Sequence, residues 1–177
     1  FPKIPAQAVG PRDADYLWSL AKQSNNVKVS MATHGKFLPD TTGHNIIAEI
    51  KGSQFPDEII TIGGHLDSWD VNEGAHDDGA GVVHTMEVMR ALLAVGYQPK
   101  RTIRFVLFAN EENGLRGGSA YAAAAKDKKE KHIFALESDE GGFTPRGFSF
   151  TAAPEKVAAA QRWLPLLKHY GTSSMDD

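Results

Sequence analysis

The sequence of 177 residues contains no cysteine. This absence excludes disulfide bonds and thiolate zinc ligands, so any metal site must be built from His, Asp and Glu side chains. The chain also lacks an apolar run near the roughly 20 residues that cross a bilayer. A strong charge of one sign is missing as well, since the net charge is -3 at pH 7. We therefore expect neither nucleic acid nor a membrane as a partner.

The overall composition is that of a globular domain. Hydrophobic residues make up 41% and charged residues 23% of the chain, which is typical of soluble proteins. The length suits one domain over residues 1–177, with a leading helix segment at 1–25, an α/β core at 26–170 and a tail at 171–177. The N-terminus lacks an initiator Met and a signal-peptide pattern, so we expect these residues to come from within a longer chain.

Hydrophobic periodicity predicts strands that alternate with helices. Strands are predicted over residues 27–33, 45–50, 59–62, 101–108, 133–136 and 147–151. Helices are predicted over 13–23, 79–95 and 115–126, and a last helix is predicted to begin at Pro154 and to bend or end near Pro165. This order predicts an α/β fold, in which a mixed, mostly parallel sheet is sandwiched between helices. We expect the first two strands to form a broad hairpin.

Acidic and imidazole residues gather where the predicted buried strands end. The clusters are His65-Leu66-Asp67, Gly74-Ala75-His76-Asp77-Asp78-Gly79, Asn110-Glu111-Glu112 and Glu137-Ser138-Asp139. In α/β folds, the carboxyl ends of the strands are where binding sites are built. Four such clusters at these positions predict one shared site.

The first two clusters contain residue types that bind metal. Residues two apart in an extended chain point to one side, so Asp67 can orient one nitrogen of His65 while the other binds a metal. The alternative is a loop histidine capped by a carboxylate. Asp77 and Asp78 need a cation to offset their repulsion if both are buried. The alternative is that one of them is a helix N-cap.

The other two clusters can supply a base and further ligands. One of Glu111 and Glu112 can bind a metal while the other takes a proton from an attacking water. A solvated turn is the alternative for this pair, and surface acidity is the alternative for the cluster around Asp139. Oxygen and nitrogen ligands suit zinc, manganese or cobalt, and zinc is the first expectation where imidazole takes part in hydrolysis.

These four motifs, in this order, resemble the M28 family of metallopeptidases, and they are most similar to its carboxypeptidase Q branch. The resemblance implies the zinc-dependent exopeptidase fold, which is phosphorylase/hydrolase-like. It also implies two zinc ions. His65 would bind one zinc, Asp77 would bridge both, and Glu112 and Asp139 would complete the two ligand sets.

The resemblance also implies how the site would work. Glu111 would be the general base, Asp67 would be the carboxylate that orients His65, and the peptide bond between Asp77 and Asp78 would be cis. The expected reaction is hydrolysis of a peptide bond near a chain terminus, in a peptide or dipeptide substrate. Aminopeptidase and carboxypeptidase activity both stay open, and the family points to a secreted or periplasmic location.

One ligand of the family has no match in the sequence. The family's fifth ligand is a histidine well downstream of the Asp139 position, and His169 is better explained as a cation at a helix end. We therefore expect a catalytic domain that is incomplete at its C-terminus, with exposed apolar surface through which a homo-oligomer can form. The alternatives are an amidohydrolase acting on acylated amino acids and a non-catalytic fragment or binding module.

Overall fold

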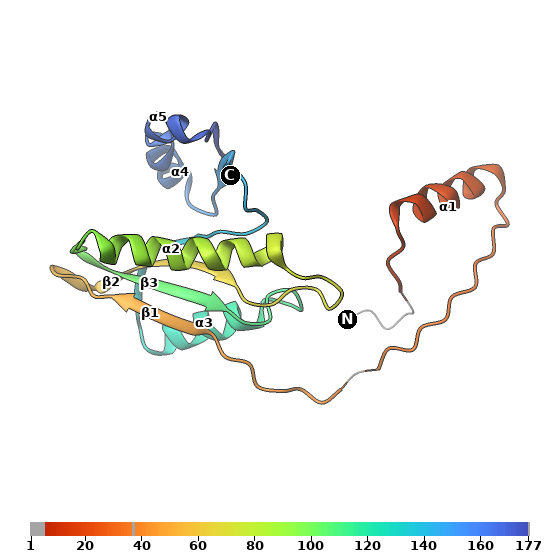
Figure 1. The fold of residues 1–177 in the computed structure, drawn as a ribbon, viewed down its shortest axis with the longest axis horizontal. Coiled ribbons are helices and arrows are strands. Elements are labelled where there is room, and N and C mark those ends of the chain that lie inside the picture. Colours follow the sequence, from red (N-terminus) through yellow and green to blue (C-terminus); the bar gives the residue numbers. More distant parts are fainter. Residues whose placement is uncertain (1–5, 37, 177) are drawn as a thin grey trace. The chain divides into compact units, whose positions relative to one another are not determined.

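The computed structural model describes residues 6–36 and 38–176 (Figure 1). The chain divides into two compact units, residues 1–41 and 42–177, and each is described by itself. Residues 1–5 of the expected leading segment and residue 177 of the expected tail lie outside the described residues.

The first unit contains the helix α1 (Pro11–Gln23), which confirms the predicted leading helix. Proline occupies its first turn, where a missing N–H costs no hydrogen bond. The predicted strand over residues 27–33 is wrong, because these residues form neither strand nor helix. Val29 is 73% exposed and Met31 is 50% exposed, so the alternating pattern has no packed face. The expected hairpin is therefore absent from the described structure.

The second unit is built on a four-stranded sheet. Its strands are β1 (Ile46–Ile50), β2 (Phe55–His65), β3 (Arg101–Phe108) and β4 (Lys131–Glu137), in the spatial order β1-β3-β2-β4. β2 runs parallel to both β3 and β4, and β1 runs antiparallel to β3. The prediction of a mixed, mostly parallel sheet is confirmed. The antiparallel strand β1 pairs with β3, not with the preceding segment of the chain.

Two helices cover opposite faces of this sheet (Figure 1). α2 (Ala80–Ala94) connects β2 to β3, and α3 (Arg116–Asp127) connects β3 to β4. The first connection runs from β2 to its neighbour β3, and the second runs from β3 back past β2 to β4 on the other side. The carboxyl ends of these three parallel strands therefore meet at a topological switch point, where α/β proteins bind ligands. In the described part of the chain, no helix is long and apolar enough to span a membrane.

The C-terminal part forms a second, smaller sheet. Its two strands are β5 (Gly147–Ser149) and β6 (Ser174–Asp176). Between them in the chain lie α4 (Pro154–Gln161), α5 (Leu164–Leu167) and the 3-10 turn η2 (Lys168–Tyr170). The helix that begins at Pro154 ends before Pro165, as predicted. The predicted tail is wrong at Ser174–Asp176, which pairs with β5 in parallel and buries Met175 to 4% exposure.

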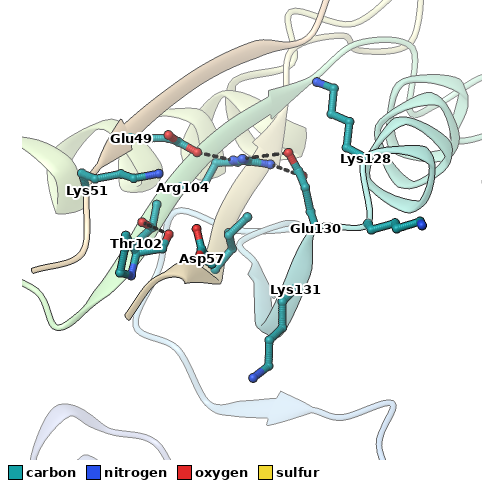
Figure 2. A pocket seen from close by; sticks show the side chains of 11 residues that line it. Glu49, Lys51, Asp57, Thr102, Arg104, Lys128, Glu130 and Lys131 are labelled. Carbon is teal, nitrogen blue, oxygen red and sulfur yellow. Dashed lines mark hydrogen bonds and ion pairs between the residues drawn. The ribbon is translucent and has the colours of Figure 1, made fainter. Parts of the chain in front are cut away.

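Arg104, within the central strand β3, links β1 to the residue that precedes β4. Its guanidinium donates hydrogen bonds to Glu49 (2.7 Å) and Glu130 (2.6 Å) (Figure 2). It also donates one to the hydroxyl of Tyr121 (3.0 Å). The hydrogen bond from Arg104 lowers the pKa of Glu130 to about 2. Arg104, Glu49 and Glu130 line a pocket of about 300 Å³ whose lining includes no residue of the four clusters. The network stabilises the sheet and lies apart from the candidate site.

Candidate active site

His65 lies at the centre of the candidate site. It is the last residue of β2, and its side chain is 1% exposed. Its Nδ1 lies 3.0 Å from the main-chain carbonyl oxygen of Asp67. A carbonyl oxygen only accepts hydrogen bonds, so Nδ1 carries the hydrogen of the neutral ring and Nε2 presents its lone pair.

Carboxylates surround this lone pair. Nε2 of His65 lies 3.1 Å from Asp77 Oδ1, 3.4 Å from Asp139 Oδ1 and 3.8 Å from Glu111 Oε2. It is buried and has no hydrogen-bond partner among the described residues. The ligand atoms of His65, Asp77 and Asp139 all lie within 4.8 Å of one another. The fold thus brings residues from all four clusters to His65, and the ligand atoms of three of these residues lie close enough to share a metal ion.

Asp77 and Asp78 lie in the turn η1 (Ala75–Gly79), just before α2, and both have non-helical backbone angles. The peptide bond between them is cis, which confirms what the family resemblance implies. Their side chains make different contacts. Asp77 faces Nε2 of His65, whereas Asp78 is 1% exposed and accepts the main-chain N–H groups of His65 (2.8 Å) and Gly81 (2.9 Å).

Asp78 therefore joins the end of β2 to the first turn of α2. It accepts the N–H of Gly81 in the first turn of α2, but the N-cap of that helix is Gly79, so the alternative that one of the two aspartates is the N-cap is wrong. It also accepts the main-chain N–H of His65, a contact that the sequence did not predict.

Asp67 makes contacts that differ from the prediction. Its carboxylate accepts the main-chain N–H of Glu111 (Oδ1, 2.9 Å) and of Glu112 (Oδ2, 3.2 Å). The carboxylate lies 3.8 Å from Nδ1 of His65, and the hydrogen bond that orients the imidazole comes from the main-chain carbonyl of Asp67. The expected hydrogen bond between the Asp67 carboxylate and His65 is thus replaced, because the carboxylate oxygens are occupied by the turn after β3.

Burial and the carboxyl groups that lie close together around His65 shift pKa values in the site. Burial raises the pKa of Glu111, and the carboxylate of Asp139 raises it further. Burial raises the pKa of Glu112 as well, with a contribution from Asp77. Burial disfavours a charged His65, yet the carboxylates of Asp78, Asp139 and Glu111 and the hydrogen bond with the Asp67 carbonyl together raise its pKa.

A metal cation fits this arrangement. Nε2 of His65 and Oε1 of Glu112 are both buried without a hydrogen-bond partner in the part of the chain that the structure describes. An unpaired lone pair beside carboxylate oxygens is repulsive unless a proton or a cation lies between them. Imidazole nitrogen and carboxylate oxygens without sulfur are a ligand set that zinc accepts. These residues can therefore hold zinc.

Asn45 and His84 contact segments that carry residues of the site. Asn45 accepts the N–H of Ala109 (2.9 Å) and donates to the carbonyl of Gly117 (2.8 Å), so it holds both ends of the loop that carries Glu111 and Glu112. His84 on α2 lies 2.9 Å from the hydroxyl of Ser138, next to Asp139. His169 lies in η2 with its ring against Tyr170. No sequence motif marked Asn45, since a single polar residue before a strand carries no distinctive signal.

The chain matches known peptidases over most of its length. Residues 45–177 match the model of peptidase family M28. Mouse carboxypeptidase Q is 37% identical over 167 residues, which are 94% of this chain and 36% of the mouse protein. Probable leucine aminopeptidase 2 of Aspergillus oryzae is 32% identical over 111 residues, which are 63% of this chain and 21% of that protein.

Solved structures agree with the sequence matches. The crystal structure of a peptidase M28 precursor from Shewanella amazonensis is similar with a TM-score of 0.70 and 40% identity, over 77% of this chain and 31% of that chain. The chain spans only about a third of the length of these relatives. The match over residues 45–177, together with the four motifs and their arrangement around His65, shows that the chain belongs to peptidase family M28.

Proposed function

We propose that this chain carries the active site of a metal-dependent exopeptidase, which hydrolyses a peptide bond near a chain terminus. The observation that carries the proposal is the buried Nε2 of His65, which faces the carboxylates of Asp77 and Asp139 at 3.1 Å and 3.4 Å. Membership of the M28 family and the peptidase names of the relatives support it.

We propose that His65, Asp77 and Asp139 hold one zinc ion and that Asp77 shares a second with Glu112. The first assignment rests on the three ligand atoms that lie within 4.8 Å of one another. The second rests on Glu112, whose buried Oε1 is unpaired in the described structure and whose pKa is raised by burial and then by Asp77. Zinc bound at such a site lowers the pKa of water and polarises a carbonyl group.

Glu111 is the proposed general base. Its Oε2 lies 3.8 Å from Nε2 of His65, beside the proposed ligands, and burial raises the pKa of its carboxyl group. A raised pKa makes the carboxylate a better proton acceptor. Glu111 takes a proton from the attacking water as the carbon–oxygen bond forms. It then delivers that proton to the amine as the carbon–nitrogen bond breaks.

The substrate assay separates this function from its alternatives. We expect the zinc-loaded protein to cleave dipeptides with free termini and to leave peptides blocked at both ends intact, with activity lost on chelation. Measuring released amines by reaction with ninhydrin tests this. Faster cleavage of acylated amino acids would identify an amidohydrolase instead. Hydrolysis of no substrate by the zinc-loaded protein would favour a non-catalytic module.

Three expectations about the whole protein remain predictions. The relatives' names cover both carboxypeptidase and aminopeptidase activity, so the terminus that is attacked stays open. The secreted or periplasmic location rests on the family resemblance. Self-association rests on exposed apolar side chains such as Val83 (61% exposed) and Leu93 (56%) on α2.

A further inference from the structure

The geometry points to the Asp67 carboxylate as a positioning residue for the turn that carries Glu111 and Glu112. This inference rests on the proposed function, in which Glu111 is the base and Glu112 a metal ligand. It gives Asp67 a task different from orienting His65, which is the role implied by the family resemblance.

Both oxygens of the carboxylate are used on this turn. Oδ1 accepts the N–H of Glu111 at 2.9 Å, and Oδ2 accepts the N–H of Glu112 at 3.2 Å. Successive N–H groups along a strand point to opposite sides, so one acceptor cannot usually reach both. Here Asn110 has φ 56°, and this left-handed residue turns the chain directly after β3. The turn lets both N–H groups converge on one carboxylate, as in backbone anion sites.

The turn is fixed at its ends as well as in its middle. Asn45 holds the N–H of Ala109 and the carbonyl of Gly117, which lie before and after the two glutamates. Within the turn, the carbonyl of Glu111 accepts the N–H of Leu115 at 2.8 Å. Asp67 contacts the main chain of both glutamates through side-chain hydrogen bonds. Losing its carboxylate would free the backbone where the base and the ligand are attached.

The contact with His65 is independent of this carboxylate. The imidazole Nδ1 is held by the main-chain carbonyl of Asp67 at 3.0 Å, and every substitution at position 67 keeps that carbonyl. A side-chain change at Asp67 therefore separates the two roles. An effect that passes through the turn should spare the zinc site of His65, Asp77 and Asp139. An effect that passes through His65 should weaken that site.

The test is Asp67→Asn in the full chain. Asparagine keeps the shape of the side chain but replaces one acceptor oxygen with an NH₂ group, which cannot accept a main-chain N–H. We expect at least one of the amides of Glu111 and Glu112 to exchange with solvent about tenfold faster or more, measured residue by residue by NMR. We also expect kcat to fall by about 10–100-fold, KM to change little, and zinc affinity at the His65 site to stay unchanged.

Asp70→Asn is the matched control, because it removes one negative charge from the same loop at an exposed position. It should leave both amide exchange and kcat as they are. The inference is overturned if Asp67→Asn leaves the exchange of both amides unchanged, or if it weakens the His65 zinc site as much as it lowers kcat. It is also overturned, even if the variant does not fold, when both amides of the unsubstituted chain exchange as fast as exposed ones.

The readouts also separate this inference from the proposed function. If the zinc-loaded chain cleaves no peptide, the proposed function fails, while amide exchange still tests the position of the turn. If peptides are cleaved but exchange does not respond to Asp67→Asn, the proposed function stands and the positioning role is wrong.

Discussion

Glu111→Gln is expected to lower the turnover of a dipeptide by about 10²–10⁴-fold, the usual contribution of a general base. Glutamine has the same shape as glutamate, and its main-chain N–H can still donate to Asp67. It cannot take a proton from water near neutral pH, however. The loss should therefore appear in kcat and not in the fold or in zinc binding. Steady-state kinetics, calorimetric zinc titration and thermal unfolding of the same preparation check all three.

Glu112→Gln is the matched control for this prediction, because it makes the same chemical change at the neighbouring position. We expect it to weaken binding of the second zinc, since Glu112 is the proposed ligand whose buried Oε1 is unpaired among the described residues. A Glu111→Gln protein with near-normal turnover would show that Glu111 is not the base. Equal loss of zinc from both variants would show that Glu111 is a ligand as well.

Gly81→Ala should damage both the fold and the metal site. A Cβ atom at Gly81 would lie 1.9 Å from the main-chain oxygen of Ser138 and 2.4 Å from Oδ1 of Asp78. The main chain of Ser138 cannot easily move away from the added Cβ atom, because the N–H of Ser138 donates to the carbonyl of Gly63 in β2. We expect a loss of about 1–3 kcal/mol in the free energy of unfolding, as for overpacked cores. We also expect weaker zinc binding, because Asp139 follows Ser138 directly.

Gly118→Ala provides the comparison for Gly81→Ala. Gly118 also lies in a helix, α3, and a Cβ atom there would meet nothing within 4 Å. The substitution should stabilise the helix by about 0.5–1 kcal/mol, because alanine loses less backbone entropy than glycine. Chemical denaturation of both variants measures the difference. Similar stabilities for the two variants would mean that α2 does not approach Ser138 as closely as described.

The sequence predicted the elements of the sheet better than their pairing. The apolar run at Arg101–Phe108 is a strand with the predicted bounds, since both faces of a central strand are covered and the signal is continuous. Alternation at residues 27–33 predicted a strand that is absent, because alternation shows which side chains share a face and says nothing of a partner strand. For the same reason, nothing in the sequence of β1 indicated that its partner is β3.

The sequence predicted which residues gather in the site, but not all of the contacts that hold them there. Residue type and position marked the clusters of His65, Asp77 and Asp139, the family resemblance implied that the three bind metal, and the fold brings all three together. The target of Asp67 did not follow, because two residues apart is a strong local signal that favours His65 over the distant turn at Glu111. Asp78 and Asn45 act through main-chain hydrogen bonds, and such partners depend on tertiary structure alone.

The most direct test of the metal site is a calorimetric titration of the metal-stripped chain with zinc at neutral pH. We predict one tight site per chain that requires His65, Asp77 and Asp139, and weaker binding at Glu112, which has only Asp77 to share a second ion with among the proposed ligands. His65→Ala should abolish the tight site. Absence of tight binding, or tight binding that survives His65→Ala, would contradict the proposed metal centre.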